Sequence, residues 1–193
     1  TIVDTCGTGG DKKHTLNIST ATAILAAACG VKVAKHGNKS VSSNSGSSDV
    51  LEKLGVNINA PKNKVEKCLE NSKLCFLMAP IYHRAMKNVA EVRSKLKIPT
   101  IFNLLGPLLN PANANIQLIG VYSYEWMLPI AKCLKDFKIK KAWVVHGQDG
   151  LDEITTTAKT DVIEVNNNKI KRFTIDPAKL ELRKSKLSYL KGK

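Results

Sequence analysis

A short stretch near the start of the chain combines glycines with acidic and hydroxyl side chains in an order that suits a phosphate ligand. Residues 4–11 read Asp-Thr-Cys-Gly-Thr-Gly-Gly-Asp, and residues 15–20 read Thr-Leu-Asn-Ile-Ser-Thr before an alanine-rich segment. Glycines let backbone N–H groups turn toward a ligand, and a helix N-terminus adds free N–H groups and a partial positive charge. The oxygens of Asp11 and Ser19 are of the kind that Mg²⁺ prefers. The stretch therefore predicts a site for a magnesium-bound polyphosphate.

This glycine stretch (residues 4–11) is not specific when taken alone, because a tight turn between a strand and a helix has the same composition. It lacks the Lys-Ser/Thr ending of the P-loop and the Gly-x-Gly-x-x-Gly frame of dinucleotide-binding folds. A second motif is needed to choose between a turn and a phosphate site.

Residues 35–49 form a second polar cluster, which reads Lys-His-Gly-Asn-Lys-Ser-Val-Ser-Ser-Asn-Ser-Gly-Ser-Ser-Asp and follows an apolar strand expected over residues 31–34. Its serine-rich composition also suits a flexible linker. However, short hydrogen-bond donors and two ammonium groups directly after a buried strand can wrap a phosphate and a ribose. Two such loops at strand ends favour an α/β enzyme that binds a doubly phosphorylated substrate.

The elements that must position these loops alternate between strands and helices. Gly30 and Gly55 stand where helices should end, and Pro61 stands at the first turn of another. Strands are expected over residues 2–3, 31–34, 74–78, 100–103, 116–121 and 142–145, and helices over residues 18–29, 48–54, 62–71, 84–97 and 125–137. This alternation predicts an α/β fold with a largely parallel sheet flanked by helices, and a ligand beyond the carboxyl ends of the strands.

The last part of the chain follows a different pattern. Residues 161–165 and 169–175 flank three asparagines and predict a β-hairpin. Charged residues increase after Asp176-Pro177, where a partial helix or disorder is expected. We expect one α/β catalytic domain over residues 1–193, with its motifs in residues 1–155 and a weakly defined part in residues 156–193.

Composition fits an enzyme domain. The 193 residues are 43% hydrophobic, which is enough for one substantial core. There is no apolar run of the ~18–20 residues that a membrane span needs and no visible leader, so a cytoplasmic protein is expected. The five cysteines are scattered without a Cys-x-x-Cys pair, which favours reduced thiols over disulfides or a zinc site. Cys6 is expected to be a packing residue and not a nucleophile.

The formal net charge of +14 invites a nucleic-acid interpretation. Only four of the 30 basic residues are arginine, the residue that base readout and bidentate phosphate contacts favour. Lysines spread along the whole chain indicate a solvated surface instead, whose field can steer a polyanionic substrate. Binding of nucleic acid is therefore not expected.

Taken together, these motifs resemble those of the anthranilate phosphoribosyltransferase family. The two polar motifs pair as they do in that family, and further runs recur in the family's order at residues 79–83, 92–93, 102–111 and 147–153. The resemblance implies transfer of the 5-phosphoribosyl group from 5-phosphoribosyl 1-diphosphate to the amine of anthranilate, in tryptophan biosynthesis. It also implies Mg²⁺ as the cofactor.

The resemblance further implies that the chain is an internal fragment. Family members begin with a small helical domain before the glycine stretch and continue past the point where residue 193 ends. That helical domain is expected to be absent from residues 1–193. It contributes to the dimer interface, so a homodimer is expected for the full-length enzyme.

The resemblance carries the donor and metal sites over residue by residue. Ser19, Asp152 and Glu153 would hold the metal. No residue is assigned as a general acid or base, because diphosphate leaves readily once its charge is neutralised and the anthranilate amine is already a neutral nucleophile. The phosphoribosyl donor would contact Gly7, Gly10, Asp11, Thr15, Asn17, Ile18, Ser19, Thr20, Lys35, His36, Gly37, Asn38, Lys39, Ser40, Val41, Ser42, Ser43 and Ser47.

Three residues match the family's anthranilate contacts, namely Gly7, Asn38 and Arg93. A guanidinium such as that of Arg93 can bind a carboxylate with two hydrogen bonds. His36 and His83 would form walls of the same pocket.

The chain departs from the family pattern at four positions. Lys39 stands where the family often has arginine, and Arg84 and Glu91 each replace a common proline. Pro99 occupies a position that is usually arginine, which removes a positive charge near the acceptor side. We therefore expect these departures to affect affinity for the acceptor more than binding of the donor.

Two other functions stay open. A pyrimidine-nucleoside phosphorylase shares the architecture, but its first loop typically carries Lys-His-Ser before Thr-Gly-Gly, whereas this chain has Asp-Thr-Cys-Gly at residues 4–7. A non-catalytic nucleic-acid-binding relative of the fold would suit the charge. Such a protein would not need Asn38, Arg93 and the pair Asp152-Glu153 together.

Overall fold

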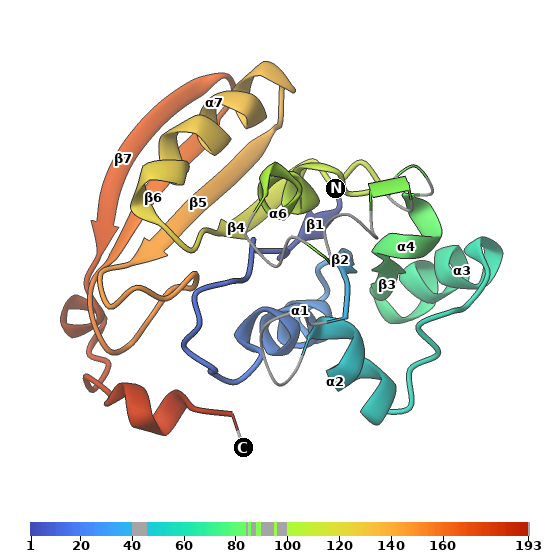
Figure 1. Cartoon of the computed structure of the whole chain (residues 1–193), viewed down its shortest axis with the longest axis horizontal. Helices are drawn as coiled ribbons and strands as arrows, with labels where there is room; N and C mark the ends of the chain where they lie inside the picture. The colour runs from blue at the N-terminus through green and yellow to red at the C-terminus, as the bar shows by residue number, and fades with distance from the viewer. Residues whose placement is uncertain (40–45, 84, 86–87, 90–94, 96–99, 193) are drawn as a thin grey trace.

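Seven strands form one sheet, and the first five of them run parallel, so that their carboxyl ends meet at one edge (Figure 1). The computed structural model describes residues 1–39, 46–83, 85, 88, 89, 95 and 100–192. The spatial order is β3-β2-β1-β4-β5-β6-β7. The strands are β1 Val3–Asp4, β2 Val33–Gly37, β3 Leu74–Met78, β4 Ile116–Gly120, β5 Lys141–Gly147, β6 Thr160–Asn166 and β7 Lys169–Ile175. The predicted α/β fold with a largely parallel sheet is confirmed.

Helices connect the strands and pack against the sheet (Figure 1). Gly30 and Gly55 adopt φ values of +89° and +84° directly after the first two helices, as their predicted role at helix ends requires. The described helices and helical turns are α1 Ile18–Ala28, α2 Ser47–Lys53, α3 Lys62–Ser72, α4 Ala79–Tyr82, α6 Ile101–Leu105, η2 Gly106–Leu108, η3 Tyr124–Trp126, α7 Met127–Asp136, η4 Pro177–Leu180 and η5 Leu187–Leu190. None of them has the length and apolar character needed to cross a membrane. The helix expected over residues 84–97 lies mostly outside the described residues.

The largest apolar core lies between α7 and strands β4 to β6. Helix α7 buries Met127, Ile130, Ala131 and Leu134, which follow the i, i+3, i+4, i+7 spacing of one helix face. They pack among aliphatic side chains of the sheet, such as Val144. This core fixes the positions at which β4 and β5 end.

Strand β2 differs from the expected strand over residues 31–34, because it begins later and continues through Lys35, His36 and Gly37. Its register with β3 pairs Lys35 with Phe76 and Gly37 with Met78. Lys35 and His36 are only 1% and 2% exposed, so the loop position expected for them is wrong. The prediction ended the strand at residue 34 because the apolar pattern ends there. The hydrogen-bond partners of Lys35 and His36, such as Thr5 and Gly106, lie far away in the sequence.

Residues 100–103, expected to form a strand, instead begin helix α6. Thr100 is extended, with φ −128° and ψ 170°, and its backbone N–H donates to Asn103 Oδ1 at 2.9 Å. The Thr-x-x-Asn spacing is that of a capping box, which stabilises a helix start. This local capping outweighs the strand preference of Thr and Ile at the same positions.

The predicted hairpin is confirmed as β6 and β7, and β6 also pairs antiparallel with β5, so the hairpin extends the main sheet. The tail forms two short helical turns, η4 and η5, and then returns to the segment after the glycine stretch. Leu16 N donates to Leu190 O at 2.8 Å, and Gly192 N donates to His14 O at 3.0 Å.

Replacing Asn110 with alanine should lower the free energy of unfolding by about 2–3 kcal/mol. Its Nδ2 donates to Asp4 Oδ2 at 2.7 Å and to Ala34 O at 2.8 Å, and Asp4 is 1% exposed. The substitution removes one hydrogen bond from each of these two buried acceptors, and the loss of hydrogen bonds from buried polar groups is costly. Urea unfolding measures the change, with Asn71→Ala on exposed α3 as the control. A loss no larger than that of the control would contradict this role of Asn110.

Candidate functional site

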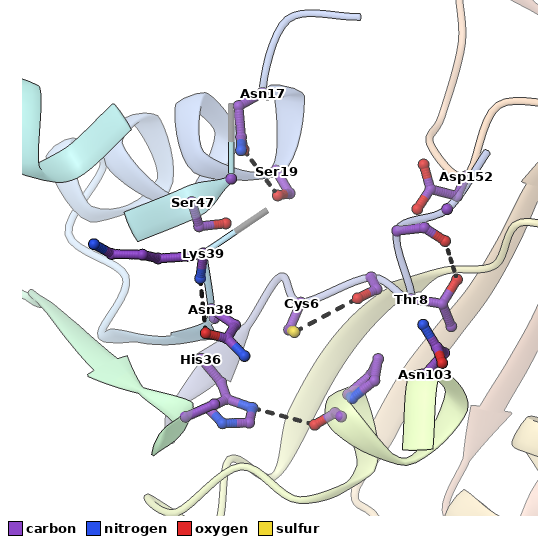
Figure 2. A pocket seen from close by; sticks show the side chains of 18 of the residues that line it. Cys6, Thr8, Asn17, Ser19, His36, Asn38, Lys39, Ser47, Asn103 and Asp152 are labelled. Carbon is purple, nitrogen blue, oxygen red and sulfur yellow. Dashed lines mark hydrogen bonds between the residues drawn. The ribbon is translucent and has the colours of Figure 1, made fainter. Parts of the chain in front are cut away.

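A cavity of about 440 Å³ opens beyond the carboxyl ends of the parallel strands (Figure 2). The glycine stretch, the end of β2, helices α4 and α6 and the loop after β5 all contribute to its walls. Asp11, Lys35 and Glu153, which the sequence predicts to share one site, all line it. The other predicted residues that line it are Gly7, Gly10, Thr15, Asn17, Ser19, His36, Gly37, Asn38, Lys39, Ser47 and Asp152.

Some predicted residues are not among those that line the cavity. Thr20 is buried in α1, and Ile18 is half-buried in the same helix. The predicted contacts Ser40, Val41, Ser42, Ser43 and Arg93 lie outside the described residues.

The start of α1 presents Ser19 to the cavity in a fixed orientation (Figure 2). Asn17 caps the helix, because its Oδ1 accepts from Thr20 N at 3.0 Å. The same oxygen accepts from Ser19 Oγ at 3.2 Å, and Lys35 Nζ donates to Ser19 Oγ at 3.1 Å. A hydroxyl has one hydrogen and two lone pairs, so Ser19 keeps one lone pair for a ligand.

Lys35 reaches the cavity from the buried strand β2. Its Nζ lies 3.4 Å from Thr5 Oγ1 and 3.5 Å from Thr5 O, in addition to its bond to Ser19. Thr5 Oγ1 also donates to Ser19 O at 3.0 Å. Burial raises the pKa values of Asp4 and Glu153, and the charge of Lys35 offsets part of that rise. Lys35 is therefore a buried positive charge at the base of an acidic site.

Three carboxyl groups line the same cavity, those of Asp11, Asp152 and Glu153. The Asp152 carboxyl group is hydrogen-bonded to that of Asp11 and accepts from Gly9 N, while Glu153 accepts from Ser19 N. Burial raises the pKa of Asp152 to about 7, with the charge of Asp11 adding to the rise. Burial and the charge of Asp152 raise the pKa of Glu153 to about 8.

This set of donors fits a magnesium ion. Carboxylates that crowd together away from water destabilise one another's charged forms, and a divalent cation among them would remove that cost. The oxygens of Ser19, Asp152 and Glu153 are ligands of the type that Mg²⁺ takes, and Asp11 lies beside them.

Two glycines, Gly7 and Gly120, allow the backbones of neighbouring segments of the site to come into direct contact. An added Cβ on Gly120, at the end of β4, would overlap the carbonyl oxygen of Asp152. An added Cβ on Gly7 would lie 3.1 Å from Gly120 O, and Thr8 N donates to Gly120 O at 2.8 Å. The glycine stretch, the end of β4 and the Asp152 backbone are thus held in direct contact.

Two histidines form another wall of the cavity, as predicted. His36 Nδ1 lies 3.1 Å from Gly106 O, and a carbonyl only accepts, so Nδ1 carries the hydrogen. His36 Nε2 must then accept from His83 Nε2, which lies 3.1 Å away. Burial, followed by the charge of His83, lowers the pKa of His36 to about 4. His36 is therefore neutral near pH 7.

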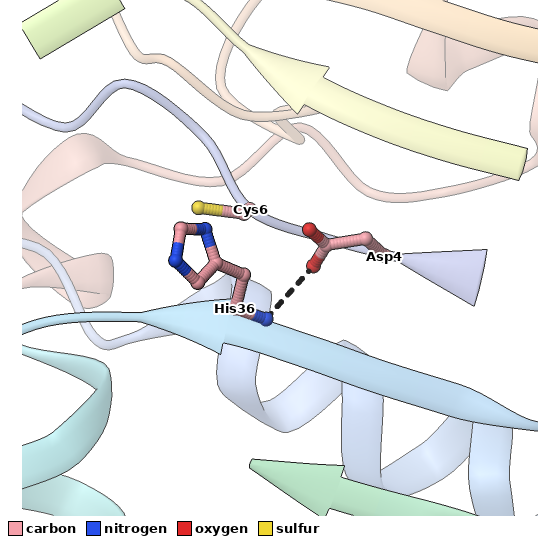
Figure 3. Close-up of side chains that lie close together, drawn as sticks. All are labelled: Asp4, Cys6 and His36. Atoms are coloured by element: carbon pink, nitrogen blue, oxygen red, sulfur yellow. Dashed lines mark hydrogen bonds between the residues drawn. The ribbon is translucent and has the colours of Figure 1, made fainter. Parts of the chain in front are cut away.

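Asp4, Cys6 and His36 form a second group of metal-type ligands, whose ligand atoms lie within 4.8 Å of one another (Figure 3). Asp4 already accepts from His36 N at 3.2 Å and from Asn110 at 2.7 Å. Burial, with the charge of Asp4 adding to it, raises the pKa of the Cys6 thiol to about 12. This protonated thiol supports the packing role predicted for Cys6.

Cys6 should react with iodoacetamide at least about 100-fold more slowly than exposed Cys29 in the native protein, because only the thiolate is nucleophilic. Its raised pKa keeps it protonated at mildly alkaline pH. Alkylation followed by peptide mass spectrometry measures both rates in one sample. Equal rates at the two cysteines would contradict the half-buried, protonated state of Cys6.

Thr5 and Gly120, which hold the walls of the site in place, are among the residues that sequence reasoning missed. Thr5 anchors Lys35 and Ser19, although it looks like an ordinary strand residue. Gly120 ends an apolar strand, and a glycine after such a run could have indicated a close backbone approach. Its partner, Asp152, lies too far along the chain for any local pattern to identify it.

Comparison with known proteins gives a consistent picture. The anthranilate phosphoribosyltransferase of Clostridium kluyveri is 58% identical over 175 residues, which cover 91% of this chain and 52% of that protein. The enzyme of the same name from Caldanaerobacter subterraneus is 55% identical over 192 residues, covering 100% of this chain and 57% of the relative. The chain thus spans about half the length of the curated relatives that it matches.

Solved structures agree with the sequences. The anthranilate phosphoribosyltransferase of Thermus thermophilus superimposes with a TM-score of 0.92 at 43% identity, over 100% of this chain and 56% of the other. The Saccharomyces cerevisiae enzyme in complex with PRPP and Mg gives 0.89 at 36% identity, over 99% and 53%. The family model described as "Glycosyl transferase family, a/b domain" matches residues 1–193. From the glycine stretch to the end of the tail, this chain belongs to that glycosyl transferase family.

Proposed function

We propose that the complete protein carrying this chain transfers the 5-phosphoribosyl group from 5-phosphoribosyl 1-diphosphate to the amine of anthranilate and releases diphosphate, in tryptophan biosynthesis. The observation that carries the proposal is the convergence of the glycine stretch, the start of α1 and the pair Asp152-Glu153 on one cavity. Relatives at 50–58% identity that bear the name anthranilate phosphoribosyltransferase support it.

The donor would bind with its diphosphate between the glycine stretch and the N-terminus of α1. Free backbone N–H groups there stabilise an anion, as does the partial charge of the helix. Ser19, Asp152 and Glu153 would hold Mg²⁺, with Asp11 close by. When bound, Mg²⁺ neutralises charge on the leaving diphosphate. The remaining donor contacts proposed in residues 35–47 would close over the phosphates.

The acceptor would lie against Gly7, Asn38 and Arg93, with His36 and His83 as the cavity wall. Neutral His36 places no positive charge beside the anthranilate ring. No general base is assigned, because the amine attacks C1 in its neutral form and loses its proton afterwards. These residues would then hold the amine in line with C1. Such an orientation can lower the activation free energy by several kcal/mol.

We also propose a homodimer for the complete protein and a cytoplasmic location. The location is supported by the cysteines, all of which are free, as reducing compartments favour. Size-exclusion chromatography with light scattering tests the dimer, and a monomer at micromolar concentration would overturn it. Neither a nucleoside phosphorylase nor a nucleic-acid-binding protein is favoured by the relatives.

The test mixes the complete protein with 5-phosphoribosyl 1-diphosphate, Mg²⁺ and anthranilate and follows the loss of anthranilate fluorescence. Loss that requires all three components supports the proposal. Phosphorolysis of a pyrimidine nucleoside instead would favour the phosphorylase. No turnover, together with salt-sensitive binding of DNA, would favour a nucleic-acid-binding protein.

A further inference from the structure

The loop that carries Asp152 and Glu153 contains another carboxylate, Asp149, which is not among the described residues that line the cavity. Its Oδ1 accepts from Leu151 N at 3.1 Å, and its Oδ2 accepts from Thr155 Oγ1 at 2.7 Å. The hydroxyl of Thr157 also donates to Oδ2. These donors lie on both sides of Asp152 and Glu153 in the sequence, so the Asp149 side chain closes the loop around the pair.

The backbone of the same loop leaves space for the Asp149 carboxylate. Gly147 N donates to Leu151 O at 2.8 Å, and Gly150 N donates to Gly147 O at 2.8 Å. An added Cβ on Gly147 would lie 2.5 Å from Asp149 Oδ1, so the carboxylate rests directly over this glycine. Thr155 N is fixed in turn by Thr160 Oγ1 at 3.1 Å, which ties the loop to β6.

Asp149 differs in its environment from the two acidic residues that it encloses. Burial raises its pKa, but the hydrogen bonds from Thr157, Thr155 and Leu151 N together outweigh burial and lower it. Hydrogen bonds to an ionised acceptor are roughly twice as strong as neutral ones. Asp149 thus has its own donors and needs no cation, whereas Asp152 and Glu153 face the cavity and one another.

We infer that Asp149, through Thr155 and Thr157, is a positioning residue that sets where Asp152 and Glu153 stand and thereby the affinity of the site for Mg²⁺. The inference rests on the proposed function, because that function makes the pair a metal site. Groups that orient metal ligands without touching the metal commonly change affinity by about 10–100-fold when they are removed. Asp149 acts on the metal only through the loop.

The test measures Mg²⁺ dependence in the complete protein with Asp149→Ala. The half-saturating Mg²⁺ concentration should rise about tenfold, while kcat at saturating Mg²⁺ stays within about threefold. Binding of Mn²⁺, followed by electron paramagnetic resonance, should weaken by a similar factor without any turnover assay. Asp149→Asn keeps an oxygen for Leu151 N and should restore most of the affinity, and Thr157→Val should weaken it to a smaller extent.

The matched control is Glu164→Gln. Glu164 in β6 accepts from Trp143 Nε1 in β5 at 2.9 Å, and neither residue belongs to the loop that carries Asp152 and Glu153. Its Mg²⁺ dependence should stay within about twofold of the wild type. If Asp149→Ala lowers only the melting temperature and leaves Mn²⁺ binding unchanged, the inference is wrong. If Asp149→Ala does not fold, wild-type Mn²⁺ affinity in Thr157→Val overturns the inference in the same way. A wild type that binds Mn²⁺ but consumes no anthranilate would overturn the proposed function alone.

Discussion

In the complete protein, Glu153→Gln is expected to lower kcat/KM for the proposed phosphoribosyl transfer by about 10³-fold. The substitution keeps the size of the side chain and its contact with Ser19 N, but removes one negative charge from the proposed metal site. Without that charge, Mg²⁺ would be held weakly and the leaving diphosphate would lack its counter-charge. Steady-state kinetics by anthranilate fluorescence over a series of Mg²⁺ concentrations measure the loss, and chelation with EDTA should abolish activity of the wild type.

The stability of the same variant separates catalysis from folding. Burial and the charge of Asp152 raise the pKa of Glu153 to about 8, so near pH 7 its ionisation favours the unfolded chain. Replacing Glu153 with glutamine removes that effect and should leave the melting temperature unchanged or raise it. Glu164→Gln is the matched control, since Glu164 accepts from Trp143 Nε1 at 2.9 Å in β6, outside the residues that line the cavity. Retention of more than about one-tenth of the activity by Glu153→Gln would contradict the metal role.

A second large effect is expected for Gly120→Ala, which should reduce both stability and activity. The new methyl group would overlap the carbonyl oxygen of Asp152, so either β4 or the loop after β5 must move. Forced movement of this kind costs about 3 kcal/mol and should lower the melting temperature by at least about 5 °C. A shift of about 1 Å in Asp152 should reduce kcat/KM about 100-fold.

Gly106→Ala provides the comparison for stability. Gly106 has helical angles of φ −48° and ψ −54°, and an added Cβ would have no atom within 4 Å other than those of its chain neighbours. Alanine there should change the free energy of unfolding by no more than about 1 kcal/mol, because restriction of the unfolded chain is offset by crowding of the new Cβ against the ring of Pro107. If scanning calorimetry gave the same melting temperature for Gly120→Ala and the wild type, the close approach of β4 to Asp152 would be disproved.

Patterns that are local in sequence predicted most of the framework. Strand β3 was predicted with its observed bounds, because a short continuous run of Leu, Cys, Phe and Met is typical of a strand buried on both faces. The hairpin and the glycines after α1 and α2 also follow from local chemistry. The parallel strands then bring the polar motifs together at one edge, as the alternation of elements requires.

The parts that were predicted wrongly or missed depend on distant partners. Lys35 stays in a strand because Thr5 and Ser19 accept its hydrogen bonds, and no window around residue 35 contains them. Gly120 is required because its backbone touches that of Asp152, which lies 32 residues later. Asp149 is held by the hydroxyl of Thr155, which lies outside the motif at residues 147–153. Helix α6 is a different case, because its Thr-x-x-Asn capping box is local in sequence, whereas the prediction followed the strand propensity of Thr100 and Ile101.

The return of the tail to the segment after the glycine stretch has a consequence for biosynthesis. Leu190 and Gly192 bond to the backbones of Leu16 and His14, which line the cavity. Contacts between such distant parts of a chain form late, because the intervening loop must close first. The cavity wall at His14 and Leu16 is therefore completed only after residues 190–192 have been synthesised, and a nascent chain would acquire its sheet before this wall of the cavity.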